Sequence, residues 1–214
     1  MLPWSADLRG RIDQQTIASE LLKDNPLKDP YERPLWVYLP PGYDAEPNRR
    51  YPSVYVIQGY TGHLAMWNNR APFRQPFPET ADAVFASGEA PPAIVVYVDA
   101  WTAYGGSQFV DSPGTGRYHS YLCDEVVPWV DARYRTLDGP GHRSIMGKSS
   151  GGFGAMITPV RGSNGSCTVP SWPAEKQAAT PSSPSRSWSA SLVNDVREPK
   201  SAHQRQMSPS YSRR

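Results

Sequence analysis

Hydrophobic residues in the first part of the chain gather in short runs of the length of β-strands. Residues 54–57 and 93–98 are continuous apolar runs, which are typical of strands buried on both faces of a sheet. Residues 35–39 form a third run that ends at a Pro-Pro-Gly terminator, and residues 142–146 form a fourth. Residues 14–22 alternate only weakly, so they fit either an edge strand or a short helix.

Two segments between these runs carry helical patterns. Residues 79–87 place apolar side chains on one side and end at Gly88, which predicts a short amphipathic helix. Residues 121–134 also have an apolar face, and Pro128 within them predicts a kink or a late start of the helix. Residues 101–118 are rich in Gly, Ser and Pro, which predicts a long loop of the kind that lines a functional site.

The order of these elements predicts the fold class. Strands that alternate with helices or long loops indicate an α/β domain with a mostly parallel sheet. Ligands of such sheets bind at the carboxyl ends of the strands. We therefore expect the loops that follow Ile57, Val98 and Met146 to meet on one face of the domain.

The segment after the fourth run has a glycine two residues to either side of a serine. Gly147-Lys148-Ser149-Ser150-Gly151 fits the G-x-S-x-G spacing of a nucleophile elbow, a strained turn between a strand and a helix. Flanking side chains would crowd such a turn, and glycine removes that crowding. The spacing selects Ser149, because the same frame on Ser150 would need a glycine at position 148. The alternative is an ordinary Gly/Ser turn, but the strand before it and the helix after it favour the elbow.

Several motifs, in order along the chain, resemble those of one enzyme family. The segments are DSPGTGRY at 111–118, YL at 121–122, DEVVP at 124–128, YRT at 134–136 and GKSSGGFGAM at 147–156. They resemble the esterases of the α/β-hydrolase superfamily that are similar to enterochelin esterases, S-formylglutathione hydrolases and mycolyltransferase-type enzymes. The resemblance covers residues 8–158 and implies the N-terminal portion of an α/β-hydrolase fold with a nucleophile elbow.

The resemblance further implies a serine hydrolase of carboxylic esters that works through an acyl-enzyme. Ser149 would be the nucleophile, and the backbone N–H groups of Tyr60 and Ser150 would form the oxyanion hole. A small-molecule ester would be the substrate. We expect no cofactor and no metal ion, because the sequence has neither metal-ligand spacing nor a phosphate-binding glycine loop.

Four residues of the expected loop are candidates for the lining of the substrate pocket. They are Trp101, Tyr104, Asp111 and Ser112, which would lie above the sheet on the acyl or alcohol side. The alternative for Trp101 and Tyr104 is that they pack the loop onto the domain.

A serine hydroxyl needs a base, and in α/β-hydrolases the acid and the histidine of the triad follow the serine in the chain. The candidates after Ser149 follow no strand-like run, and they are Glu175, Asp195, Glu198 and His203. The histidines that precede the serine are His63, His119 and His142. We therefore expect an incomplete triad and impaired hydrolysis. The alternative is a non-catalytic remnant or a binding protein that retains the elbow.

The composition changes abruptly near residue 157. Residues 157–214 contain 13 Ser and 7 Pro, whereas the 156 residues before them contain 10 Ser, and no hydrophobic period is sustained there. We interpret residues 1–156 as a partial α/β-hydrolase domain and residues 157–214 as a disordered or aberrant tail, with the C-terminal part lost or frameshifted. The strand at residues 142–146 would then be an exposed edge of a marginally stable sheet.

Charge and cysteine content limit the classes of partner and the compartment that we expect for the protein. The net charge of +2 and the scattered basic residues of the tail favour neither a nucleic acid nor a membrane surface as partner. We find neither an apolar run at the N-terminus nor a stretch long enough to span a bilayer. Cys123 and Cys167 lie too far apart in the sequence for a metal or redox motif, so we expect free thiols in a cytoplasmic protein. The oligomeric state stays open.

Overall fold

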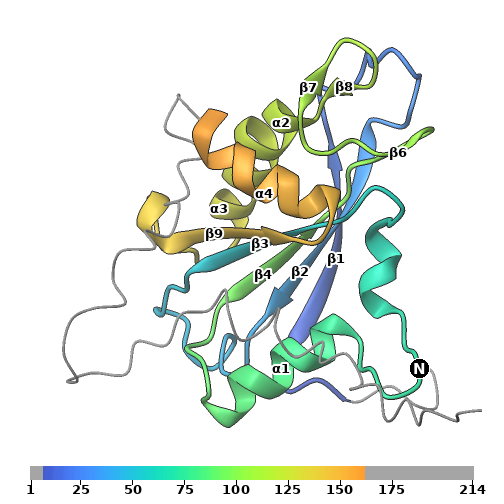
Figure 1. Cartoon of the computed structure of the whole chain (residues 1–214). Coiled ribbons are helices and arrows are strands. Elements are labelled where there is room, and N and C mark those ends of the chain that lie inside the picture. Colours follow the sequence, from blue (N-terminus) through green and yellow to red (C-terminus); the bar gives the residue numbers. More distant parts are fainter. Residues whose placement is uncertain (1–6, 162–214) are drawn as a thin grey trace, which may run out of the picture. The chain divides into compact units, whose positions relative to one another are not determined.

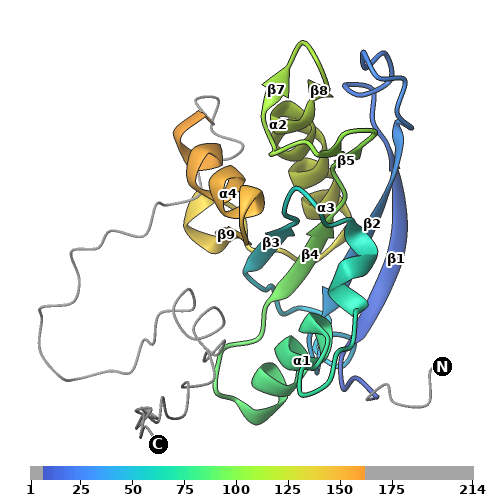
Figure 2. The same ribbon diagram turned by 45° about the vertical axis from the view of Figure 1, so that its right-hand side comes forward.

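Five strands form one sheet with helices on both of its faces in the computed structural model, which describes residues 7–161 (Figure 1, Figure 2). The spatial order of the strands is β1-β2-β4-β3-β9. Their bounds are Arg11–Ala18 for β1, Glu32–Leu39 for β2, Ser53–Ile57 for β3, Ile94–Val98 for β4 and Arg143–Gly147 for β9. The four apolar runs of the sequence are therefore strands, and the weakly alternating segment contains the edge strand β1 and no helix.

The pairing directions make the sheet mixed. β3 is parallel to both β4 and β9, as expected, but β2 is antiparallel to both β1 and β4. The expectation of a mostly parallel sheet thus holds only for β4, β3 and β9. β1 and β2 are antiparallel because their connection, residues 19–31, contains no crossover helix that could return the chain to the starting end of the sheet.

The remaining elements are helices and two short hairpins. The helices are η1 (Leu64–Asn68), α1 (Phe77–Ser87), α2 (Tyr118–Ser120), η2 (Tyr121–Val126), α3 (Val127–Arg133), η3 (Pro140–His142) and α4 (Ser150–Arg161). The hairpins pair β5 (Trp101–Thr102) with β6 (Gly105–Gly106) and β7 (Asp111–Ser112) with β8 (Gly116–Arg117). The expected long loop at residues 101–118 is therefore folded into two tight hairpins.

Pro128, in the predicted helix at residues 121–134, lies where the helix changes its geometry. Residues 121–126 form a π-helical turn, in which the N–H of Val127 donates to the carbonyl of Leu122, five residues earlier. Pro128 follows in the first turn of α3, where its missing N–H costs least. The kink predicted from Pro128 therefore takes the form of a π-helical turn that joins α2 to α3.

The two faces of the sheet bury different helices. Leu35 and Val37 of β2 belong to the core that also contains Tyr121 and Val130 of the η2–α3 segment. Tyr38 points to the other face, where its ring stacks on Phe85 of α1 with the ring centroids 5.9 Å apart. This alternation is the period-two pattern of a strand with helices on both sides.

Helix α4 covers the last strand. It packs against β9 and β3 (Figure 1). Its Ala155 and Ile145 of β9 are partly buried and both pack against the core. In the part of the chain that the structure describes, β9 pairs only with β3, so it is the outer strand on that side. Helix α4 extends to Arg161, past the composition change near residue 157, and residues 162–214 lie outside the described part.

The structure also bears on the state of the cysteines and on membrane-spanning helices. Cys123 is not a free thiol, which corrects the expectation for this residue, and Cys167 lies outside the described part. The sequence could not show this, because separation along the chain does not give the distance in the fold. None of the helices formed by residues 7–161 combines the length and the apolar character that crossing a membrane requires.

Asp82 of α1 connects three elements, so its removal tests the packing of α1. Its carboxylate accepts hydrogen bonds from the hydroxyl of Tyr38 (2.8 Å) and from the backbone N–H groups of Arg9 (3.0 Å) and Gly10 (2.7 Å). Asp82→Ala leaves the buried hydroxyl of Tyr38 and two partly buried N–H groups without an acceptor and should lower the free energy of unfolding by about 1–3 kcal/mol. Urea denaturation measures this, with Asp24→Ala at an exposed position as the control. Equal effects of the two substitutions would contradict the prediction.

Candidate active site

Ser149 lies in a tight turn between β9 and α4, at the carboxyl end of the strand. Its side chain is exposed, and its φ is +60°, in the left-handed region that residues other than glycine rarely adopt. Such a conformation costs about 1–3 kcal/mol and persists only where surrounding contacts impose it. The strand–turn–helix geometry that the sequence predicted around Ser149 is therefore present, with the strain located on the serine itself.

The two glycines of the G-x-S-x-G spacing allow the turn to press against the end of β3. A Cβ on Gly151 would lie 2.5 Å from the carbonyl oxygen of Ile57 and 2.6 Å from that of Gln58. A Cβ on Gly147 would lie 2.7 Å from the same oxygen of Ile57. All three distances are too short for any side chain. The close approach of two backbones therefore requires both glycines, and neither needs a positive φ.

The loop that follows β3 lies beside the serine. We call residues 59–63 the Gly59 loop. A Cβ on Gly59 would lie 3.1 Å from the carbonyl oxygen of Lys148 and 3.5 Å from Cβ of Ser149. The N–H of Gly62 donates to the carbonyl of Gly59 (3.2 Å) and closes the loop into a turn. The structure therefore brings Tyr60, a predicted site residue, into the loop that adjoins Ser149.

A second segment holds the Gly59 loop from the other side. We call residues 101–106 the Trp101 hairpin; it comprises β5, β6 and the turn between them. The N–H of Gly106 donates to the carbonyl of Tyr60 at 2.7 Å, and a Cβ on Gly105 would lie only 2.8 Å from the same oxygen. Trp101 is half-buried, whereas Tyr104 at the turn is 68% exposed. The two aromatic candidates thus belong to a hairpin that contacts the predicted site.

The other two candidates for the pocket lining have local partners. The carboxylate of Asp111 accepts hydrogen bonds from the backbone N–H (2.9 Å) and the hydroxyl (2.7 Å) of Ser120, at the end of α2. The hydroxyl of Ser112 accepts from the N–H of Gly114 at 3.1 Å. These bonds shape the β7–β8 hairpin and its junction with α2, and they give both side chains a role in the fold.

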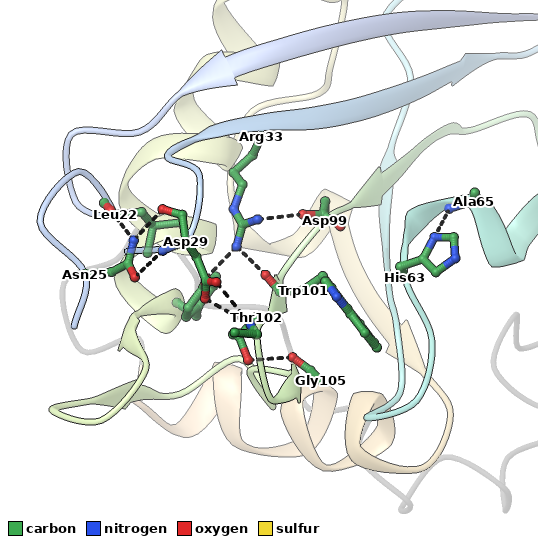
Figure 3. Close-up of polar contacts among 12 residues, drawn as sticks. Leu22, Asn25, Asp29, Arg33, His63, Ala65, Asp99, Trp101, Thr102 and Gly105 are labelled. Atoms are coloured by element: carbon green, nitrogen blue, oxygen red, sulfur yellow. Dashed lines mark hydrogen bonds and ion pairs between the residues drawn. The ribbon is translucent and has the colours of Figure 1, made fainter. Parts of the chain in front are cut away.

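The histidines within residues 7–161 occupy three different environments. Nδ1 of His63 accepts a hydrogen bond from the N–H of Ala65 at 3.2 Å, and the ring meets Trp101 edge-on with the centroids 6.0 Å apart (Figure 3). An accepting Nδ1 places the neutral ring's proton on Nε2, which leaves Nε2 unable to act as a base. His119 is buried, with Nε2 3.8 Å from Sγ of Cys123. His142 ends η3, at the opposite end of β9 from Ser149.

A buried ion pair beside the Trp101 hairpin was not predicted from the sequence. Arg33 of β2 and Asp99, the residue after β4, are 4% and 5% exposed, and Nη1 of Arg33 lies 3.3 Å from Oδ2 of Asp99 (Figure 3). The guanidinium also donates hydrogen bonds to the carbonyl of Trp101 and the hydroxyl of Tyr118. In the sequence, Arg33 stands between Glu32 and Pro34, which are both exposed, so no neighbour marks it as buried. Only the alternation of β2 could have indicated that the side chain of Arg33 points inward.

Gln58 links the ends of two strands below the same loops. Oriented so that its polar atoms are satisfied, its side-chain amide donates to the carbonyl of Val98 (2.9 Å). In this orientation it accepts from the N–H groups of Ala100 (3.2 Å) and Trp101 (3.1 Å). Gln58 is 1% exposed. The end of β3 is thereby tied to the end of β4 directly under the Gly59 loop.

This fold and turn agree with the comparisons with known proteins. A family model described as "Putative esterase" matches residues 30–165, and the chain belongs to this family. A solved ferulic acid esterase is similar in structure, with a TM-score of 0.58 and 26% identity over 74% of this chain and 58% of that chain. The fold of the chain is thus that of the α/β-hydrolase esterases.

Two further solved structures share the fold. The feruloyl esterase module from Clostridium thermocellum has a TM-score of 0.52 and 22% identity over 70% of this chain and 51% of that chain. An S-formylglutathione hydrolase from Agrobacterium tumefaciens has a TM-score of 0.53 and 20% identity over 74% of this chain and 56% of that chain. The matched part of the chain thus spans somewhat more than half the length of these proteins.

The close approach of Gly151 to β3 makes a direct prediction. Gly151→Ala places a methyl group against two backbone carbonyls that cannot move aside independently, so it should destabilise the fold by about 1–3 kcal/mol or more. Gly141→Ala is the matched control, because a Cβ there meets nothing within 4 Å. Urea denaturation of both variants measures the difference, and an equal effect of the two would show that the turn does not rest on this contact.

Proposed function

We propose that this chain belongs to a carboxylic-ester hydrolase in which Ser149 is the nucleophile. The support comes from the exposed serine at a left-handed turn, between a strand and the first turn of a helix, with the Gly59 loop beside it. Oγ of Ser149 would attack the ester carbonyl carbon while a base takes its proton. The alcohol would then leave with a proton, and water would hydrolyse the acyl-enzyme.

Two backbone N–H groups are the proposed stabilisers of the tetrahedral intermediate. The N–H of Ser150 belongs to the first turn of α4, where helical N–H groups lack intrahelical acceptors and the helix dipole favours negative charge. The N–H of Tyr60 belongs to the Gly59 loop and shares its peptide plane with the carbonyl of Gly59, which accepts from the N–H of Gly62. Fixed donors of this kind supply a large share of the catalysis of acyl transfer.

The proposed base is not among the histidines of residues 7–161. His63 has its ring proton on the wrong nitrogen, and the other two are buried beside Cys123 or lie at the far end of β9. The remaining acid and base candidates, Glu175, Asp195, Glu198 and His203, lie outside the described residues. The second proposal is therefore a chain that retains the turn and binds ligands without turnover, and the next experiment separates the two.

Labelling with a fluorophosphonate tests the nucleophile. The chain should react at Ser149 much faster than an exposed serine without a base, and Ser149→Ala should abolish the labelling. Ser150→Ala is the matched control, because it removes a neighbouring hydroxyl but keeps the backbone N–H. Mass spectrometry identifies the modified residue and gives the rate. Labelling no faster than that of a surface serine would favour the binding protein over the hydrolase.

Aromatic side chains of the Gly59 loop and of the Trp101 hairpin suggest a substrate class. Tyr60 of the Gly59 loop is 47% exposed and lies against Gly105 of the Trp101 hairpin. Tyr104 of that hairpin is also exposed. Flat aromatic surfaces of this kind stack on aromatic rings. With the similarity to a ferulic acid esterase, this extends the proposal to esters of aromatic acids.

A substitution at Tyr104 tests this extension. Tyr104→Ala should raise KM for methyl ferulate about two- to tenfold, because a stacking contact contributes about 0.5–1.5 kcal/mol. The same variant should leave KM for an ethyl butyrate substrate unchanged. Steady-state kinetics with both esters gives the comparison, and an equal change with the two would contradict an aromatic subsite.

A further inference from the structure

The pair Arg33–Asp99 is a buried charge pair that stability alone does not explain. Burial raises the pKa of the Asp99 carboxyl, and the positive charge of Arg33 and the backbone N–H groups of Trp101 and Leu64 oppose that shift. Burying two charges costs a large desolvation free energy, and apolar residues of similar volume often stabilise a fold equally well or better. A buried pair of this kind therefore calls for a second explanation, which its hydrogen bonds supply.

The hydrogen bonds of the pair go to the backbone of the segments that hold the Gly59 loop. The backbone N–H groups of Leu64, the residue directly after that loop, and of Trp101 lie close enough to the carboxyl of Asp99 to lower its pKa. Arg33 donates to the carbonyl of Trp101, the first residue of the Trp101 hairpin. Figure 3 shows the guanidinium of Arg33 pointing between Asp99 and Trp101. The two charges thus bind the backbone on both sides of the predicted site.

The Gly59 loop is held at two points that both depend on this pair. At its end, the N–H of Leu64 lies close enough to the carboxyl of Asp99 to lower its pKa. In its middle, the carbonyl of Tyr60 accepts from the N–H of Gly106, and Gly106 belongs to the hairpin that starts at Trp101. The peptide plane that carries the N–H of Tyr60 also carries the carbonyl of Gly59, which accepts from the N–H of Gly62 at 3.2 Å. Together with the bond to the carbonyl of Tyr60, which fixes the next peptide plane, this bond limits how the loop can rotate.

We propose that Arg33 and Asp99 are positioning residues that orient the Gly59 loop, and with it the N–H of Tyr60, toward Ser149. This inference rests on the proposed function for its meaning in catalysis. The orientation of the loop is a property of the structure, and it can be measured without turnover. Fixed donors are effective because they need no reorganisation during the reaction, so a loosened loop would weaken the proposed oxyanion stabilisation.

The test uses four variants of the full chain. Asp99→Asn keeps the shape and removes the charge, and Arg33→Lys keeps the charge but cannot bridge the same partners. The double variant Arg33→Met/Asp99→Leu removes both charges together. Arg143→Met is the matched control, because Arg143 forms an ion pair with Asp131 at the start of β9, the end of the strand away from Ser149.

Hydrogen–deuterium exchange is the first measurement. The single variants should raise exchange in peptides covering residues 59–66 and 100–107 about tenfold or more, beyond any change in β4. The double variant should recover the stability that the single variants lose, but its loop should still exchange fast. The control should leave loop exchange unchanged. Loop exchange like that of the control, or a double variant that restores the slow exchange, would overturn the proposal.

The second measurement is the fluorophosphonate rate at Ser149. It should fall about 10- to 100-fold in the single and double variants and stay unchanged in the control, since forming the phosphonyl adduct uses the same donors. An unchanged rate in the single variants would also overturn the proposal. If the unmodified chain does not label at all, the proposed hydrolase fails, while hydrogen–deuterium exchange still decides whether the pair orients the loop.

Discussion

The contact between two backbones, the turn after β9 and the end of β3, is the constraint on which the site depends. Gly147 and Gly151 let the start of α4 approach the carbonyl oxygens of Ile57 and Gln58 to distances that exclude a Cβ. With the helix fixed there, only Lys148 and the serine remain to complete the turn, and the serine takes up the left-handed conformation. The exposure of its hydroxyl is a consequence of this packing and does not require a separate cause.

Polar side chains at the strand ends extend the same constraint outward. Gln58 ties β3 to the backbone that follows β4, and Arg33 joins that backbone to β2 through its ion pair with Asp99 and its bond to the carbonyl of Trp101. A buried polar network stabilises only when its members are satisfied together. These bonds explain how a short hairpin and an irregular loop keep a defined geometry with little regular secondary structure of their own.

The sequence predicted the features that leave a local pattern. Continuous apolar runs indicated the strands, and the spacing of Gly147 and Gly151 indicated the turn, because backbone contact excludes every other residue at those positions. Pairing direction leaves no such pattern, so the antiparallel partners of β2 were missed. The two-residue strands of the hairpins are too short for any period. Arg33 reads as a solvated charge, since its partner Asp99 is 66 positions away, and only the fold brings the two together.

The chemistry of an ester hydrolase divides into two tasks, and this fold assigns them to different parts of the chain. Presenting a serine and fixing N–H donors beside it depends on the ends of β3, β4 and β9, and the contacts that do so lie within residues 7–161. Deprotonating the serine needs an imidazole, and the three histidines of that range are committed to other contacts or lie elsewhere. The proposed reactivity of Ser149 therefore depends on a base other than these three histidines, so the geometry of the turn and the reactivity of the serine can be lost independently.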